Sequence, residues 1–264
     1  MVPKSATAYA APSWSGDDMG ARADFPYYNG QPVDIRPVGW LAILAAVAAG
    51  FALLITLPFP DFPLNLVPAI LFAGLPLLVL AMVSGGHHGA LFGRFGIREL
   101  ALAVAFGLAT MVASFVVGFV LIQFVPMASN ASAATLVNVG PAEIAVFMVR
   151  TAIQLLGEEV LTILPLLAVL WLCVRIFGLS RRAGLVVAVL ASTALFAAVH
   201  LPTYDWNIVQ CFGGIGSARL VLTAAFLVTR NLWVSTGAHI VNDWTEFFLP
   251  TLLAFGHTPV EAGA

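Results

Sequence analysis

Five ionisable residues in the C-terminal half of this 264-residue sequence could do acid–base chemistry: Glu158, Glu159, His200, His239 and Asp243. They lie in or at the ends of long apolar segments. An ionisable side chain inside a bilayer costs at least about 2.5–3.5 kcal/mol on insertion scales, so a chain keeps one where it is paired or does chemistry. Glutamate or histidine on three separate segments therefore indicates one shared, buried polar site.

The adjacent pair Glu158-Glu159 points in two directions about 100° apart on a helix. One carboxylate can then face a cavity while the other faces a neighbouring helix. A carboxylate in such a cavity is suited to deprotonating water and returning the proton to a leaving amine. The alternative is a pair at a span end, solvated by lipid headgroups, but apolar runs on both sides of the pair disfavour it.

His200 ends an apolar run and precedes Leu201-Pro202, so its helix should stop just beyond it. A lone histidine on an apolar helix is usually structural. His239 and Asp243 change this interpretation because residues at i and i+4 share one helix face. Asp243 can accept the other ring N–H of His239, or it can itself act as a ligand.

The composition is that of a membrane protein. Hydrophobic residues make up 61% of the chain and charged residues 9%, whereas soluble domains carry roughly 25% charged residues. The formal net charge of −2 offers no basic surface to neutralise phosphates, which argues against a nucleic-acid partner.

The apolar segments predict an all-α, polytopic transmembrane bundle, because a spanning helix needs about 20 mostly apolar residues. Seven spans are expected. The fourth is too long for one perpendicular helix, so it is either one tilted helix or two helices meeting near Gly157, which would make eight spans. The expected spans are 38–57, 63–84, 99–125, 141–177, 183–200, 213–230 and 231–255.

Three parts follow from this reading: a flexible cytoplasmic tail at 1–37, a transmembrane domain at 38–256 whose catalytic half is 141–250, and a C-terminal tail at 257–264. Arginines recur at alternate ends of consecutive spans. The positive-inside rule then places the N-terminus in the cytoplasm. We expect a multi-pass protein of a bacterial inner membrane.

Three motifs in order, Glu158-Glu159, Phe196-x-x-x-His200 and His239-x-x-x-Asp243, resemble those of the CPBP intramembrane endopeptidases. That family includes the CAAX-prenyl endopeptidases and the bacteriocin-processing and self-immunity proteins. The resemblance covers about residues 141–250.

One position departs from the family pattern, Glu-Glu-x-x-x-Arg, since this chain has Ile163 where the pattern has arginine. That arginine neutralises or orients the glutamate pair. Two candidates could replace it. Arg150 lies roughly 12 Å along the same helix, too far for a direct pair without a relay, and Arg219 lies on another span.

The resemblance implies an intramembrane endopeptidase that hydrolyses a membrane-associated peptide or protein in the lipid bilayer. Glu158 with His200 would activate water, while His239 and Asp243 would stabilise the oxyanion or complete a metal site. Zinc is the metal that Glu158, His200 and His239 would hold, as in a metalloprotease. The His-Glu-x-x-His helix of zinc proteases is absent, however, and we favour a metal-free glutamate mechanism.

Two other function classes remain open at this point: a catalytically inactive scaffold of the same family, and an ion-coupled transporter. A shared site also sets a geometric condition. Counting along the helices places His200 and His239 at different depths, so tilt or a re-entrant 201–212 must bring them within roughly 12 Å of each other.

Overall fold

The computed structural model describes the backbone of residues 24–59, 61–128 and 140–255. These residues form seven α-helices and several short 3₁₀ or π segments, and none of them forms a β-strand, which confirms the all-α fold class. The helices are α1 (Pro37–Thr56), α2 (Leu66–Val83), α3 (Ile97–Leu121), α5 (Pro141–Trp171), α6 (Arg181–Val199), α7 (Gly216–Thr229) and α8 (Leu232–Phe255).

Within the described residues, six helical segments are long and apolar enough to cross a membrane, which confirms a helical transmembrane bundle. They correspond to the first six predicted spans. The predicted seventh span, 231–255, is the 24-residue helix α8, which does not belong to this apolar set. Its polar residues include His239, Asn242 and Asp243, which make α8 less apolar than the six candidate spans.

The long fourth segment is one helix. α5 runs unbroken for 31 residues through Gly157 and Pro165, and a π segment, η2 (Leu172–Ile176), extends it. A Cβ atom at Gly157 would lie only 2.4 Å from Cδ1 of Phe72 in α2, so the glycine allows the two helices to pack closely. The alternative of two helices meeting near Gly157 is wrong for this segment.

α6 begins two residues before the predicted span 183–200 and ends one residue before it ends. Ser180 accepts a hydrogen bond from the Ala183 N–H at 3.3 Å, which satisfies one of the free amides of the first turn. At the other end His200 is the C-cap, and the 3₁₀ segment η3 (Leu201–Tyr204) follows with Pro202 in its first turn.

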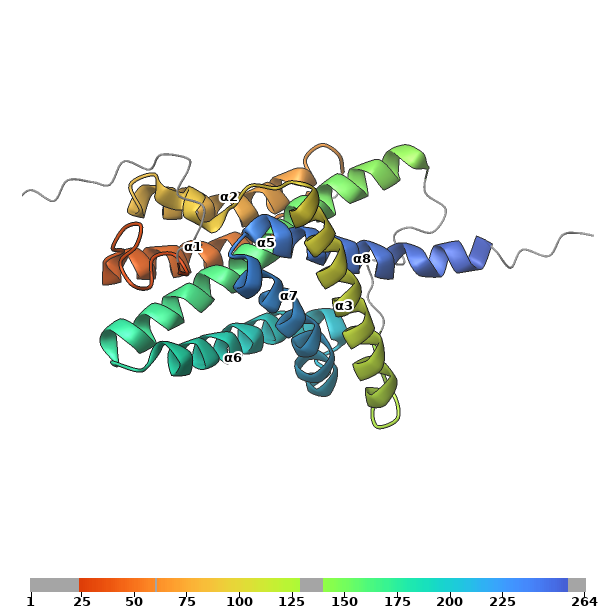
Figure 1. Ribbon diagram of the computed structural model, residues 1–264. Coiled ribbons are helices and arrows are strands. Elements are labelled where there is room, and N and C mark those ends of the chain that lie inside the picture. Colours follow the sequence, from red (N-terminus) through yellow and green to blue (C-terminus); the bar gives the residue numbers. More distant parts are fainter. Residues whose placement is uncertain (1–23, 60, 129–139, 256–264) are drawn as a thin grey trace, which may run out of the picture.

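The arrangement of α5 and α6 explains how residues at different predicted depths meet. The helices pack side by side (Figure 1). Gly184, near the start of α6, lies against Leu170 at the end of α5 and Val174 of η2. From Gly184, His200 lies 16 residues or roughly 24 Å along α6, and Glu158 lies roughly 18–24 Å back from Leu170 and Val174 along α5. His200 and Glu158 therefore meet, and residues 141–157 of α5 extend past the end of α6.

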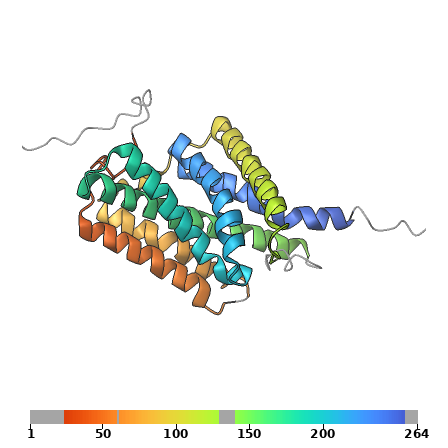
Figure 2. The same ribbon diagram turned by 90° about the horizontal axis from the view of Figure 1, so that it is seen from below.

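Helices α3, α7 and α8 complete the bundle. α3 contacts both α7 and α8 and crosses α8 at a steep angle (Figures 1 and 2). The turn between α7 and α8 is fixed by Asn231, whose side chain accepts from the Gly93 N–H at 2.9 Å and donates to the Arg94 carbonyl at 3.0 Å. This anchor sets where α8 begins and hence the depth of His239.

The described part of the predicted flexible tail is packed rather than flexible. In residues 24–36, which we call the N-terminal segment, Phe25, Tyr27, Tyr28 and Ile35 are all buried. Tyr27 donates a hydrogen bond to the His87 carbonyl at 2.8 Å. The prediction of a tail over 1–37 is thus wrong for residues 24–36, while residues 1–23 and 257–264 lie outside the described chain.

Arginines at the ends of several helices hold this segment. Arg181 donates to both carboxylate oxygens of Asp24, at 2.8 and 2.5 Å, and its guanidinium lies 5.1 Å from the Phe25 ring centre. Arg230 lies over the same ring at 5.6 Å. The start of α6 and the end of α7 therefore lie at the same end of the bundle, as their arginines predict.

Removing the Asp24 carboxylate should weaken this contact. Burial alone would raise the pKa of Asp24, but hydrogen bonds from Arg181, Tyr28 and the Phe25 amide outweigh burial and lower the pKa to about 2. Asp24→Asn should cost about 1 kcal/mol near neutral pH, a modest amount because the Arg181 side chain is 40% exposed. The measurement is the Tm of wild type and variant in detergent.

The sign of the pH dependence follows from the lowered pKa. The stabilisation is complete above the pKa of an unfolded aspartate, about 3.9, and is lost as the pH falls through the folded value of about 2. The Tm difference should therefore shrink below about pH 4. Asp34→Asn, at an exposed aspartate 4.0 Å from Arg175, is the control and should change Tm little. An equal Tm difference at all pH values would contradict the assignment.

Candidate active site

Glu159 lies at the centre of the buried polar cluster. Its side chain is fully buried and accepts two parallel hydrogen bonds from Arg219 of α7, at 2.6 and 3.0 Å. It also binds Nδ1 of His239 in α8 at 2.9 Å. One carboxylate thus joins three helices, in the bidentate geometry that is strongest for arginine and carboxylate.

Arg219 is the cation that pairs with the glutamates in this chain. It is fully buried, its Nε donates to Thr223 at 3.2 Å, and its guanidinium lies 5.1 Å from the Phe196 ring centre. Of the two candidates that could compensate for Ile163, the structure selects Arg219. Ile163 itself is fully buried one turn after Glu159.

Glu158 faces two imidazole rings, one of which, His239, also contacts Glu159. Its Oε2 lies 3.9 Å from Nε2 of His200 and 3.7 Å from Nε2 of His239, and Gln154 donates to its Oε1 at 3.1 Å. The two Nε2 atoms are therefore at most about 8 Å apart, which meets the condition for a shared site. The side chain of Glu158 is 14% exposed, so solvent reaches this carboxylate but not Glu159.

Hydrogen bonds fix the orientation of both imidazoles. His200 Nδ1 lies 2.7 Å from the Phe196 carbonyl, and because a carbonyl only accepts, Nδ1 carries the proton. In the neutral ring, Nε2 of His200 then presents a lone pair to Glu158. Nδ1 of His239 is held in the same way by Glu159, which turns its Nε2 towards Glu158.

Asp243 lies beside Nε2 of His239, the ring nitrogen that does not contact Glu159. Its Oδ1 lies 3.5 Å from Nε2 of His239 and accepts a hydrogen bond from Asn242 at 3.0 Å. The sequence left two roles open for Asp243, as the acceptor of the other ring N–H of His239 or as a ligand. In the structure Glu159 makes the closer bond to that ring, and Asp243 faces the same nitrogen as Glu158.

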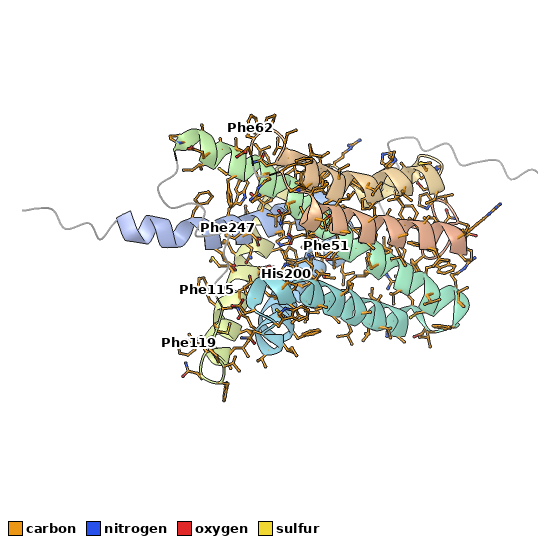
Figure 3. The ribbon with its side chains drawn as sticks, turned by 180° about the vertical axis from the view of Figure 1, so that it is seen from behind. Phe51, Phe62, Phe115, Phe119, His200 and Phe247 are labelled. Atoms are coloured by element: carbon orange, nitrogen blue, oxygen red, sulfur yellow. The ribbon has the colours of Figure 1, made fainter. Side chains whose placement is uncertain are left out.

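Two cavities meet at Glu158. The α2-side cavity, of about 610 Å³, is lined by apolar residues of α1 and α2, including Phe51, Leu54 and Phe72. The α8-side cavity, of about 400 Å³, is lined by polar residues such as His239, Asp243 and Glu246. Figure 3 shows His200 at the end of α6, with Phe51 of the first cavity and Phe247 of the second on either side of it. Glu158 and His200 line both cavities, so the reactive groups face apolar side chains of α1 and α2 on one side and polar side chains of α8 on the other.

The donors for zinc are present, but their spacing is wide. Neighbouring ligands of a tetrahedral zinc ion lie roughly 3.3 Å apart, whereas Oε2 of Glu158 is 3.7 and 3.9 Å from the two Nε2 atoms. In the part of the chain that the structure describes, no group of three or more His, Cys, Asp or Glu side chains is placed to hold a metal ion. Each gap is instead one that a single water, bonded at roughly 2.8 Å on either side, can bridge.

Some members of the site were not predicted as such. Thr223 supports Arg219 from one turn along α7, and Trp244 donates to Thr151 at 3.0 Å, joining α8 to α5 beside the site. The i, i+4 spacing of Arg219 and Thr223 is a sequence signal, but it has meaning only once Arg219 is known to face inward.

Comparison with known proteins agrees with the motifs. No curated protein and no solved structure matches the chain. Residues 140–245 match the family model described as "Type II CAAX prenyl endopeptidase Rce1-like", a family of proteases. The matched segment contains Glu158, Glu159, Arg219, His239 and the other members of the cluster described above. This match supports the family predicted from the three motifs, and the segment 140–245 of this membrane protein is similar to the CAAX-type intramembrane proteases.

Proposed function

We propose that the chain is an intramembrane endopeptidase that hydrolyses a peptide bond of a membrane-associated protein or peptide with a water molecule activated by Glu158. The observation that carries this proposal is the position of Glu158, between two oriented imidazoles and at the junction of two cavities. A general base needs space for a reactant beside it and an orientation fixed by neighbours; the two cavities and the hydrogen bond from Gln154 support both conditions.

The first step is addition of water to the scissile carbonyl. A water in the gap between Glu158 and His200 donates one hydrogen to Oε2 of Glu158 and the other to Nε2 of His200. Glu158 takes the proton as the water oxygen bonds to the carbonyl carbon. The resulting oxyanion lies next to the His239 ring, whose Nε2 is 3.7 Å from the same carboxylate oxygen.

His239 is placed to stabilise that oxyanion. Nδ1 of His239 faces the Glu159 carboxylate, and Nε2 faces the carboxylates of Glu158 and Asp243. All three carboxylates can accept hydrogen bonds. A ring with acceptors at both nitrogens is suited to carry both protons and to donate from Nε2 as negative charge develops. Collapse of the intermediate breaks the C–N bond, and Glu158 returns its proton to the leaving nitrogen.

The ion pair of Glu159 and Arg219 positions this machinery without contacting the reacting atoms. It fixes the ring of His239 and neutralises the second glutamate, so that Glu158 is the carboxylate exposed to the cavities. The absence of the family's arginine at Ile163 favours a catalytically inactive scaffold, but Arg219 of α7 supplies a positive charge to Glu159.

We further propose that this multi-pass membrane protein lies in a bacterial inner membrane with its N-terminus in the cytoplasm. The arginines at the ends of α6 and α7 lie together around the N-terminal segment, which supports a common cytoplasmic side. The apolar side chains of α1 and α2 that line the α2-side cavity fit a substrate that arrives from the bilayer.

Metal chelation should leave this activity largely intact. The donor spacing favours a bridging water, so hydrolysis should change less than about twofold after dialysis against EDTA and 1,10-phenanthroline. Peptide cleavage and zinc content by atomic emission are measured on the same sample. A loss of activity that stoichiometric zinc restores would show that the site contracts around a metal.

The enzyme and its alternatives predict different results for two variants. The enzyme loses cleavage in both Glu158→Ala and His200→Ala, while a scaffold keeps its biological function in both. Solute flux into liposomes without cleavage would indicate a transporter.

A further inference from the structure

Two exposed arginines lie at the start of α3, in residues 92–98, which we call the α3 entry segment. Arg94 and Arg98 form no side-chain hydrogen bond, ion pair or ring contact with any residue that the structure describes. Other arginines at helix ends and in the core do face carboxylates, among them Arg175, Arg181 and Arg219. The two guanidinium groups of the α3 entry segment are therefore free to bind an anion.

Exposed apolar side chains lie next to these arginines. Ile97 is 89% exposed and Phe95 is 47% exposed. Because residues three or four apart share a helix face, Ile97 begins an exposed apolar stripe along α3. The members of this stripe are Ile97, Leu100, Val104 and Leu108. Apolar surface of this kind is more stable against acyl chains than against water.

Contacts with the start of α8 hold the α3 entry segment in place. Asn231 accepts from the Gly93 N–H at 2.9 Å and donates to the Arg94 carbonyl at 3.0 Å. The rings of Phe92 and Trp233 pack with their centres 4.8 Å apart, and Trp233 is 41% exposed. Tryptophan is enriched where a bilayer meets water. These contacts therefore place the two arginines at the depth of the lipid headgroups.

Positive charge exceeds negative charge at this end of the bundle. Arg36 and Arg182 are also exposed there, at the starts of α1 and α6. The described acidic residues of this end already have partners, which are Arg181 for Asp24, Arg175 for Asp34 and an amide at the start of α3 for Glu99. An excess of arginine at a membrane surface attracts anionic lipids.

We propose that Arg94 and Arg98 bind the phosphate of an anionic lipid headgroup, while the acyl chains of that lipid lie along the apolar stripe of α3. The planar donors of a guanidinium match two phosphate oxygens at once. A zwitterionic lipid has the same phosphate, but its own ammonium group competes for it, so the arginines select a lipid with net negative charge. Neither arginine lines the α2-side or the α8-side cavity, and the proposal is independent of the endopeptidase function.

Lipid binding is measured on purified full-length protein in dodecyl maltoside, a detergent without phosphate, by native mass spectrometry of the protein–lipid adducts. The probes are dioleoyl phosphatidylglycerol and dioleoyl phosphatidylcholine, which share their chains and differ in headgroup charge. Glycerol 1-phosphate, which has the phosphate without the chains, is the competitor.

Wild type is compared with two double variants and a double control. Arg94→Gln with Arg98→Gln removes both charges, and Arg94→Lys with Arg98→Lys keeps them. The control, Arg36→Gln with Arg182→Gln, removes two other exposed charges from the same end. The Tm of every protein in phosphatidylcholine nanodiscs should equal that of wild type, because the substituted side chains are exposed.

Wild type should bind phosphatidylglycerol about 30-fold more tightly than phosphatidylcholine, since each arginine near a membrane surface contributes about fivefold. The double glutamine variant should bind the two lipids equally. The double lysine variant should keep most of the preference, and the control should change it less than about threefold.

Equal binding of the two lipids by wild type overturns the proposal. So does a preference that the double glutamine variant retains in full, or an equal loss in the control, which would show diffuse attraction instead of a site. Displacement of phosphatidylglycerol by an equal concentration of glycerol 1-phosphate also overturns it, because the ligand would then be a soluble phosphate and not a lipid.

Discussion

Glu158→Gln is expected to lower kcat/KM for peptide hydrolysis by roughly a thousandfold, within the range that a general base contributes. Glutamine keeps the shape of the side chain and can still interact with Gln154, but it cannot accept a proton from water. The fold should be preserved, because the carboxylate is partly exposed and lies 3.7 Å or more from either imidazole. The measurement is initial-rate cleavage of a quenched fluorescent peptide by purified protein in liposomes.

The matched control is Glu99→Gln, at the first turn of α3, where glutamine also satisfies the N-terminal amides. It should cleave at the wild-type rate. If Glu158→Gln retained more than about a tenth of wild-type activity with an unchanged Tm, Glu158 would not be the base.

Arg219→Leu should destabilise the protein by about 3–5 kcal/mol, since it leaves a buried carboxylate without its cation. The Glu159 and Arg219 side chains are both fully buried, and the bidentate contact is the closest ion pair in the described part of the site. The loss should lower Tm and also disturb His239, which Glu159 holds at 2.9 Å. Unfolding is followed by Tm and by the accessibility of the buried cysteines Cys173 and Cys211 to a thiol reagent.

A second variant distinguishes the effect of losing the Arg219 charge from the effect of losing the packing of its side chain. Ile163 lies one turn after Glu159 and is buried, so Ile163→Arg places a guanidinium within reach of the same carboxylate. In the background of Arg219→Leu it should restore part of the stability and activity. An unchanged Tm in Arg219→Leu would contradict the ion pair between Arg219 and Glu159. A second contradicting result has two parts: Ile163→Arg fails to restore stability to Arg219→Leu, and a separate variant, Arg219→Lys, is as stable as the wild type.

Much of the fold could be predicted from composition and spacing. Apolar segments of spanning length identify helices without any knowledge of their packing, and six of them appear at the expected positions. The motif residues were also predictable, because ionisable side chains are costly in apolar membrane segments and are kept there mainly where they are paired or catalytic. Glu158, His200, His239 and Asp243 indeed come together.

The partner of the glutamates could not be derived from local spacing. Arg219 is 60 residues from Glu159, and whether it faces inward depends on the rotation of α7 about its axis. The same holds for His200, whose meeting with Glu158 depends on how far α5 extends beyond α6. Local composition was misleading at the N-terminal segment, where Pro, Gly and charged residues suggest a tail, yet Phe25 and Tyr27 are buried by contacts with Phe226 and His87.

The most direct test of the central claim is peptide cleavage in water enriched in ¹⁸O, with mass spectrometry of the products. Purified protein in liposomes should yield an N-terminal fragment with one ¹⁸O in its new carboxyl group, and neither Glu158→Gln nor His200→Ala should yield it above background. Absence of cleavage by the wild type, or labelled product from Glu158→Gln at the wild-type rate, would contradict hydrolysis by a water that Glu158 activates.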